Sequence, residues 1–184
     1  MYIKVLWLIR NFFYKIFFFK KSRLYGYIGK PIYFTGLKNV SIGKKFRLYP
    51  MWRFEILESG TVTIEDDVSI GQFFHLVSLG SELVIKKGTV ISADVLITNS
   101  DHRFNVIDVP IYRQPMNNKI TMIGENCFIG AGAKILAGTT LGKQCVVGAN
   151  SVVKGNFPDY CVISGIPAKI IKKYDVESKQ WLTV

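Results

Sequence analysis

Aliphatic residues return at every sixth position along the second half of the chain. These positions are Ile123, Ile129, Ile135, Leu141, Val147 and Val153. A smaller residue stands two places before each of the last five, and glycine follows four of the six. A helix repeats every 3.6 residues and a strand every two, so a period of six with glycine between repeats indicates short strands joined by tight turns. The pattern therefore predicts an all-β solenoid.

The same spacing continues upstream with one interruption. The aliphatic positions there are Ile64, Ile70, Leu76, Ile85, Ile91 and Ile97, with a three-residue shift after Leu76. Residues 98–122 then contain two prolines and no periodicity. An excursion of that length inside a compact domain is usually functional. We expect a long loop at 98–122, inserted into the solenoid.

The N-terminal segment is bulky and apolar, with scattered cations. On a helical wheel Lys4, Asn11 and Lys15 fall together, and Arg10 and Lys21 lie beside them. A basic stripe on an apolar helix suits an anchor at a membrane surface, with its cations against anionic lipid. The alternative is a helix that packs on its own domain or on a neighbouring subunit. The cations divide the apolar run too often for a membrane-spanning segment, and a signal-peptide cleavage site is lacking.

The positive charge of the chain is concentrated in its N-terminal segment, and the remainder is nearly neutral. Residues 1–54 contain 12 of the 24 Lys and Arg residues and none of the 13 acids. The length of 184 residues fits one domain. Three cysteines are an odd number, which favours a reducing, cytoplasmic setting, and their spacing suits no metal site. Nucleic acid is not expected as a partner, because no recognition motif accompanies the charge.

From about residue 40 to 172 the repeat resembles the hexapeptide-repeat acyltransferases. The resemblance implies a left-handed parallel β-helix in which three hexapeptides complete one coil. The stretch from Ile85 to His102, IKKGTVISADVLITNSDH, is similar to the sugar O-acetyltransferase branch, which includes galactoside and maltose acetyltransferases. We expect a basic amphipathic helix at 1–25, the acyltransferase domain at 26–172 and a C-terminal tail at 173–184.

The resemblance also implies a catalytic base and an acceptor site. Histidine is the commonest general base near neutral pH, and His102 opens the aperiodic loop. In the similar enzymes a histidine there takes the proton of the acceptor as it attacks the thioester of acetyl-CoA. Asp101 is a candidate to orient the ring. Gln72, His75 and Asn99 are candidates for acceptor binding, with Gln72 standing where such enzymes often have Asn. His75 lies between two inward positions, so its side chain should point outward, where it either lines the acceptor groove or lies on a sheet face.

Coenzyme A binding is likewise inferred from the resemblance. By position, Ala131 and Ala149 would meet the pantetheine amides one coil apart, and Lys154 would follow on the same groove. Lys169 and Lys172 stand where basic residues commonly meet the nucleotide phosphates, and cations pair well with phosphate. The groove lies between two adjacent β-helices, so the resemblance implies a homotrimer. A metal is not implied.

The leading hypothesis is an acetyl-CoA-dependent O-acetyltransferase that transfers the acetyl group directly to a sugar hydroxyl. The acceptor would be a sugar or a lipid-linked oligosaccharide of bacterial surface polysaccharide, handled at the cytoplasmic face of the inner membrane. Two alternatives stay open. One is N-acetylation of a nucleotide-linked amino sugar, and the other is a hexapeptide scaffold without catalysis.

Overall fold

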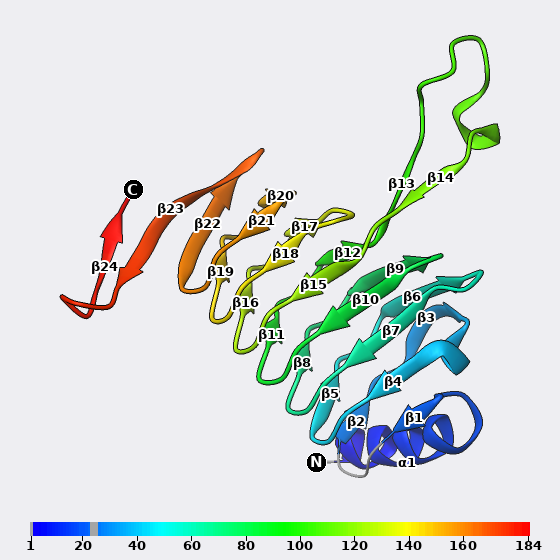
Figure 1. The fold of residues 1–184 in the computed structure, drawn as a ribbon. Helices are drawn as coiled ribbons and strands as arrows, with labels where there is room; N and C mark the ends of the chain where they lie inside the picture. Colours follow the sequence, from blue (N-terminus) through cyan, green and yellow to red (C-terminus); the bar gives the residue numbers. More distant parts are fainter. Residues whose placement is uncertain (1, 23–25) are drawn as a thin grey trace.

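The computed structural model describes residues 2–22 and 26–184, whose strands form a three-sided parallel solenoid (Figure 1). The first sheet contains β1 (Lys21–Ser22), β4 (Val40–Ile42), β7 (Thr61–Ile64), β10 (Glu82–Ile85), β15 (Thr121–Ile123), β18 (Thr140–Leu141) and β21 (Asn156–Phe157). The second contains β2 (Gly26–Ile28), β5 (Phe46–Leu48), β8 (Ser69–Ile70), β11 (Val90–Ile91), β16 (Phe128–Ile129), β19 (Val146–Val147), β22 (Cys161–Gly165), β23 (Ala168–Asp175) and β24 (Gln180–Thr183). The third contains β3 (Pro31–Thr35), β6 (Trp52–Leu57), β9 (His75–Leu79), β12 (Leu96–Thr98), β17 (Lys134–Ile135) and β20 (Val152–Val153). The predicted solenoid is confirmed.

The six-residue period marks the side chains that fill the interior. All twelve aliphatic positions of the two series are at most 1% exposed. The smaller residues two places earlier, such as Ala133 and Cys145, are also buried. The three-residue shift after Leu76 lengthens β9 as far as Leu79 before the chain turns into the first sheet. Buried apolar surface of this kind is the main stabilising contribution in such a fold.

The three cysteines form a column inside the later coils. Cys127, Cys145 and Cys161 are each at most 1% exposed, and all three are free thiols. The Sγ atoms of Cys145 and Cys161 lie 3.5 Å apart. Buried thiols of this kind act as small apolar side chains.

Aromatic side chains fill the first coils. Trp52, Phe54 and Phe74 are fully buried, and their rings contact one another edge to face at centroid distances of 4.9 and 5.9 Å. The Trp52 indole donates a hydrogen bond to the Gly29 carbonyl oxygen at 2.8 Å. Tyr14 of the N-terminal helix packs edge to face on Trp52 at 6.1 Å. This helix therefore covers the open end of the aromatic core.

The N-terminal helix α1 (Tyr2–Phe17) lies against the solenoid with its polar stripe, which differs from the expected anchor orientation. The Asn11 side-chain amide donates to the Gly26 carbonyl oxygen at 3.0 Å, and Arg10 reaches the Ile28 carbonyl oxygen at 3.4 Å. The Gly26 and Ile28 carbonyl oxygens lie on the first coil, where no earlier coil among the described residues supplies donors for them. They therefore favour contact with the polar side of the helix, whose side chains can donate hydrogen bonds. The side chains of Lys4 and Lys21 lie outside the described residues. Within residues 2–22 and 26–184, no helix is long and apolar enough to cross a membrane.

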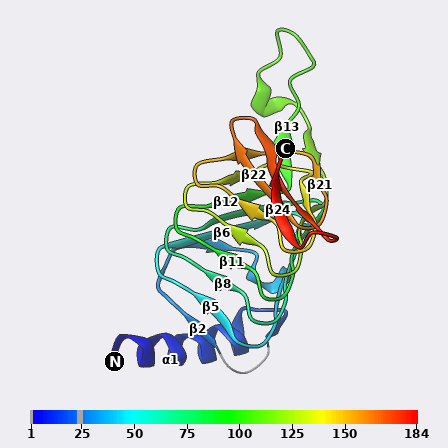
Figure 2. The same cartoon turned by 90° about the vertical axis from the view of Figure 1, so that its left-hand side faces the viewer.

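The predicted loop is present between β12 and β15 and projects from the solenoid (Figures 1 and 2). Its two arms, β13 (Ser100–His102) and β14 (Met116–Asn118), pair in antiparallel fashion. The tip contains the short 3₁₀ helix η2 (Ile111–Arg113), and a second one, η1 (Leu37–Asn39), precedes β4. The side-chain amide of Gln114 ties the tip together by bonding both backbone groups of Val106. Hydrogen bonds thus join the two arms of the loop at its base and link Gln114 to Val106 nearer the tip.

The C-terminal end closes with an antiparallel extension of the second sheet. β23 pairs with β22 on one side and with β24 on the other. β23 runs across the boundary expected at residue 172, so this strand joins the last coil to the tail. The terminal residues Gln180–Thr183 form β24.

Candidate active site

The base of the loop forms a hollow that holds the predicted base. Residues 101–105, Asn117 and Lys154 line a cavity of about 410 Å³. His102 ends β13 opposite Met116, and its side chain is exposed to this cavity. Lys154 follows β20, two coils further along, so the hollow lies where the loop leaves the corner between the third and first sheets.

Asp101 makes an ion pair with Lys154 at the edge of this hollow. The Lys154 Nζ atom lies 3.1 Å from Asp101 Oδ2, and the two side chains are 57% and 35% exposed. Successive residues of a strand point to opposite faces, so Asp101 and His102 diverge. The ion pair joins Asp101, predicted to orient the His102 ring, to Lys154, predicted to bind coenzyme A. It places a cation beside the arm that carries His102.

Asn99, a candidate acceptor contact, has its side-chain amide bonded within the chain. Its Oδ1 atom accepts the Leu79 backbone N–H at 2.8 Å, and its Nδ2 atom donates to the Ser81 carbonyl oxygen at 2.9 Å. The residue is fully buried. Three residues before His102, it fixes the start of the loop to the end of β9. Asn99 thus links the loop that carries His102 to the solenoid.

His75 points outward from β9, as alternation along a strand predicts for a residue between the buried Phe74 and Leu76. Its Nε2 atom lies 2.7 Å from Glu55 Oε1 on the neighbouring strand β6. Arg53 donates to the same carboxylate oxygen. Partial burial favours protonation of Glu55, but the hydrogen bonds from Arg53 and His75 outweigh it and lower the pKa of Glu55 below 4.5.

Sequence reasoning missed Arg53 and Glu55 as partners of His75. The signal was available in the alternation of WRFEIL, where Trp52, Phe54 and Ile56 face the core. That alternation places Arg53 and Glu55 on the outer face with His75. Pairing of β6 with β9 then sets Arg53 opposite His75.

Gln72, Ala131 and Ala149 share one column of corners between the second and third sheets. Each is exposed, and backbone hydrogen bonds link successive corners, such as Asn150 N–H to the Ala131 carbonyl oxygen at 2.8 Å. The predicted contacts to pantetheine therefore lie one coil apart, as expected from spacing. His102 lies at the other edge of the third sheet, so a single chain does not bring these residues to the base.

Lys169 and Lys172 lie on the same face of β23. Lys169 pairs with Ser164 and Lys172 with Val162, and a register shift lies between these pairs. Directly paired residues point to the same face of a sheet, and Val162 and Ser164 are two positions apart on one face of β22. The register shift adds one residue to β23 between the two pairs, so Lys169 and Lys172 also point to one face although they are three positions apart. Both side chains are exposed. The two cations are thus available on the outer surface of the last coil.

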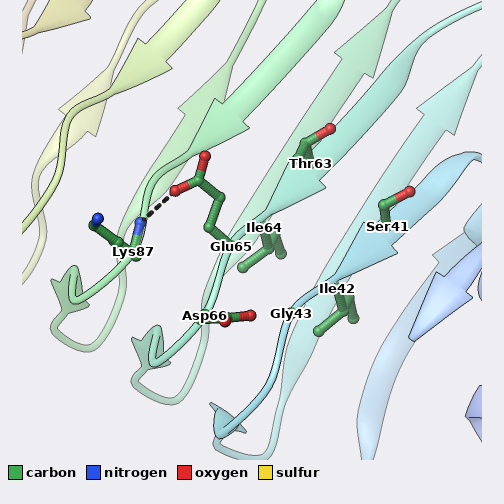
Figure 3. A pocket seen from close by; sticks show the side chains of 8 residues that line it. All are labelled: Ser41, Ile42, Gly43, Thr63, Ile64, Glu65, Asp66 and Lys87. Atoms are coloured by element: carbon green, nitrogen blue, oxygen red, sulfur yellow. Dashed lines mark hydrogen bonds between the residues drawn. The ribbon is translucent and has the colours of Figure 1, made fainter. Parts of the chain in front are cut away.

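A second hollow, on the first sheet, is separate from this site (Figure 3). It measures about 310 Å³, and its acidic side chains are Glu65 and Asp66. These carboxylates accept backbone N–H groups, Lys87 at 2.9 Å and Lys44 at 2.7 Å. Their role is to bind successive coils together. Within the described part of the chain, three or more His, Cys, Asp or Glu side chains do not gather into a metal-binding group.

Comparison with known proteins identifies the class of enzyme. The family described as the hexapeptide repeat of succinyl-transferase matches residues 120–154. The putative lipopolysaccharide biosynthesis O-acetyl transferase WbbJ of Escherichia coli K12 is 32% identical over 181 residues, which cover 95% of this chain and 90% of WbbJ. The chain belongs to the hexapeptide-repeat acyltransferases, with the left-handed parallel β-helix that the resemblance implied.

Solved structures share the fold of this chain. A D94N mutant of AntD, an N-acyltransferase from Bacillus cereus in complex with dTDP and coenzyme A, has a TM-score of 0.77 at 20% identity, covering 92% of this chain and 91% of AntD. The polySia-specific acetyltransferase NeuO has a TM-score of 0.60 at 25% identity, covering 83% of this chain and 70% of NeuO. The chain is an acetyltransferase, and the expectation of acetyl-CoA as its co-substrate is confirmed at the level of the family.

Proposed function

We propose that this protein transfers an acetyl group from acetyl-CoA to a sugar hydroxyl, with His102 as the general base. The observation that carries the proposal is the exposed His102 side chain in a hollow at the base of the loop. An imidazole in that position can accept a proton from a hydroxyl that enters the hollow. Relatives named as sugar and lipopolysaccharide acetyltransferases support the reaction type.

The reaction is proposed as a direct transfer from acetyl-CoA to the acceptor, without an acetylated enzyme. A ring nitrogen of His102 takes the hydroxyl proton while the oxygen attacks the thioester carbonyl carbon. The carbon–sulfur bond then breaks, and the coenzyme A thiolate leaves and recovers a proton from the imidazolium. An acetyl-cysteine intermediate is disfavoured because Cys127, Cys145 and Cys161 are all buried.

The complete site is proposed to form between subunits of a homotrimer. His102 and the corner column of Ala131 and Ala149 lie at opposite edges of the third sheet within one chain. A neighbouring subunit can present its corner column to His102, and Lys154, Lys169 and the exposed backbone corners would then hold coenzyme A. The ion pair between Asp101 Oδ2 and Lys154 Nζ, 3.1 Å apart, holds the lysine at this hollow.

The acceptor is proposed to belong to bacterial surface polysaccharide, handled by an enzyme peripheral to the cytoplasmic face of the inner membrane. The names of WbbJ and of NeuO support a polysaccharide substrate. Gln72 and His75 are the candidate acceptor contacts that the structure leaves exposed or half-buried. The fold shared with AntD favours one other candidate, N-acylation of an amino sugar carried on a nucleotide.

The proposal is tested by incubating the purified protein with acetyl-CoA and a panel of acceptors, and measuring the released thiol and the acetylated product. The panel contains free sugars, lipid-linked saccharides and nucleotide-linked amino sugars. His102→Ala should lower turnover by about 10²- to 10⁴-fold, the usual contribution of a positioned base. Binding of acetyl-CoA should change little.

Two further results separate the alternatives. Intersecting double-reciprocal plots would support direct transfer, whereas parallel lines or an acetylated protein would contradict it. Activity on amino sugars alone would favour the N-acyltransferase, and an active His102→Ala protein would remove the proposed base. His75→Ala tests the candidate acceptor contact: it should raise the KM for the acceptor and leave kcat largely intact, which distinguishes it from loss of the base.

A further inference from the structure

The helix α1 presents a wholly apolar face that points away from the solenoid. Its side chains are 49% to 62% exposed: Val5, Leu6, Leu8, Ile9, Phe12, Phe13, Ile16 and Phe17. At 100° per residue these eight positions cover one continuous half of the helix. Contiguous exposed apolar surface of this kind marks an interaction site rather than an ordinary protein surface.

The opposite face of α1 is fixed on the first coil. Asn11 and Arg10 bond to backbone carbonyls there, and Trp7 packs on Tyr27 and Tyr49 at centroid distances of 5.5 and 5.9 Å. These contacts prevent the helix from turning its apolar face inward without losing its polar and aromatic partners. The exposed face is therefore a fixed feature of this end of the molecule.

We propose that this apolar face inserts into the surface of an anionic lipid bilayer. Residues 1–54 carry 12 cations and no acid, so this end attracts a negatively charged surface. Exposed cations follow the helix through the first two coils: Lys20, Lys30, Lys38, Lys44 and Lys45. A second copy of the same end would bring the same positive charge, which disfavours self-association through this face.

This orientation differs from that of a helix with a lipid-facing basic stripe. The apolar half of α1 enters the boundary between headgroups and acyl chains, and the lysines of the coils meet the headgroups beside it. The helix lies across the end of the solenoid (Figures 1 and 2), so the solenoid axis rises from the bilayer. In a trimer with parallel axes, three such faces would lie in one plane.

The position of His102 then defines the class of acceptor, an inference that rests on the proposed function. His102 follows β12, the fourth strand of the third sheet counted from β3 at the helical end. Three strand spacings place the loop base roughly 14 Å beyond the first coil. A saccharide linked to lipid can extend past the helix and the first coil and present a hydroxyl at the loop base. We infer that the acceptor is lipid-linked.

Point variants test the surface better than a deletion, because removing residues 1–22 would also remove Tyr14 and Phe19 from the core. Leu6→Glu with Phe13→Glu adds two charges to the apolar face. Val176→Glu with Val184→Glu adds the same charges at exposed sites near the C-terminus and serves as the matched control. Flotation is measured with vesicles of equimolar phosphatidylglycerol and phosphatidylcholine, and with phosphatidylcholine alone.

The wild-type protein and the control should float with anionic vesicles, less so at high salt, and the helix variant should lose about tenfold or more of its binding. Sedimentation must show the same mass for all three proteins. Absence of wild-type flotation would overturn the proposal, and a mass change in the helix variant would assign the face to a contact between copies.

Activity separates this inference from the proposed function. The helix variant should lose acetylation of a lipid-linked saccharide in vesicles while it keeps acetylation of a short free acceptor. Equal activity of wild type and helix variant on both acceptors would contradict the lipid-linked assignment. If the wild type acetylates neither acceptor but still floats, the proposed function fails and the membrane surface stands.

Discussion

The coils and the loop differ in how they use apolar residues. In the coils between Ile64 and Val153 the twelve aliphatic positions of the six-residue repeat are all at most 1% exposed, so the sequence period and the burial period coincide there. In the loop every residue from His102 to Arg113 is exposed, including Ile107 at 80% and Tyr112 at 72%. The coils therefore hold the structure, and the loop is fixed mainly through its base. A catalytic residue gains from this arrangement, because a rigid scaffold positions an accessible side chain.

The sharpest test of this contrast is the same substitution in both regions. Ile135→Ala should lower the free energy of unfolding by about 2–5 kcal/mol, because it leaves a cavity in a fully packed interior. Ile107→Ala should change it by less than about 0.5 kcal/mol, since the side chain is 80% exposed. Denaturant unfolding of both variants measures the difference. Similar losses would mean that a partner covers the loop in solution.

The coil pattern could be predicted because each repeat needs an aliphatic side chain at the same interior position, six residues after the last. Twelve aliphatic positions and the loop position follow from the sequence. The orientation of α1 could not be predicted, because a helical wheel shows two faces and not which one the protein covers. The carbonyls of Gly26 and Ile28, which decide the matter, become unpaired only when the first coil ends there.

Asn99 tests how the loop is joined to the coils. Asn99→Ala should lower the free energy of unfolding by about 1–3 kcal/mol, because it leaves the buried Leu79 N–H without its acceptor. Turnover should fall as well, since His102 is three residues further along. Asn105→Ala, exposed in the same loop, is the control for stability. Unchanged stability in both variants would show that a water molecule replaces the Asn99 amide.

The site was only partly predictable, for a related reason. Spacing indicates that Ala131 and Ala149 stack one coil apart, but the ion pair between Asp101 and Lys154 joins residues 53 positions apart. Such a contact depends on how far the loop arm leans over the later coils. Sequence periodicity carries no information about an aperiodic segment, so the partners of Asp101 follow from the folded chain alone.

The smallest expected effect concerns Glu55 on the outer face of the third sheet, below the loop. Its pKa is lowered in the folded protein, so its ionised form adds stability above pH 4.5, and that stability is lost as the pH falls through the folded-state pKa. Glu55→Gln keeps the size of the side chain but removes this titration. The free energy of unfolding should therefore fall more for the wild type than for Glu55→Gln between about pH 7 and about pH 3, by under about 1 kcal/mol. Glu177→Gln, an exposed acid in the turn before β24, should follow the wild type. Identical acid profiles for Glu55→Gln and the wild type would show that the contacts with Arg53 and His75 contribute nothing to folding.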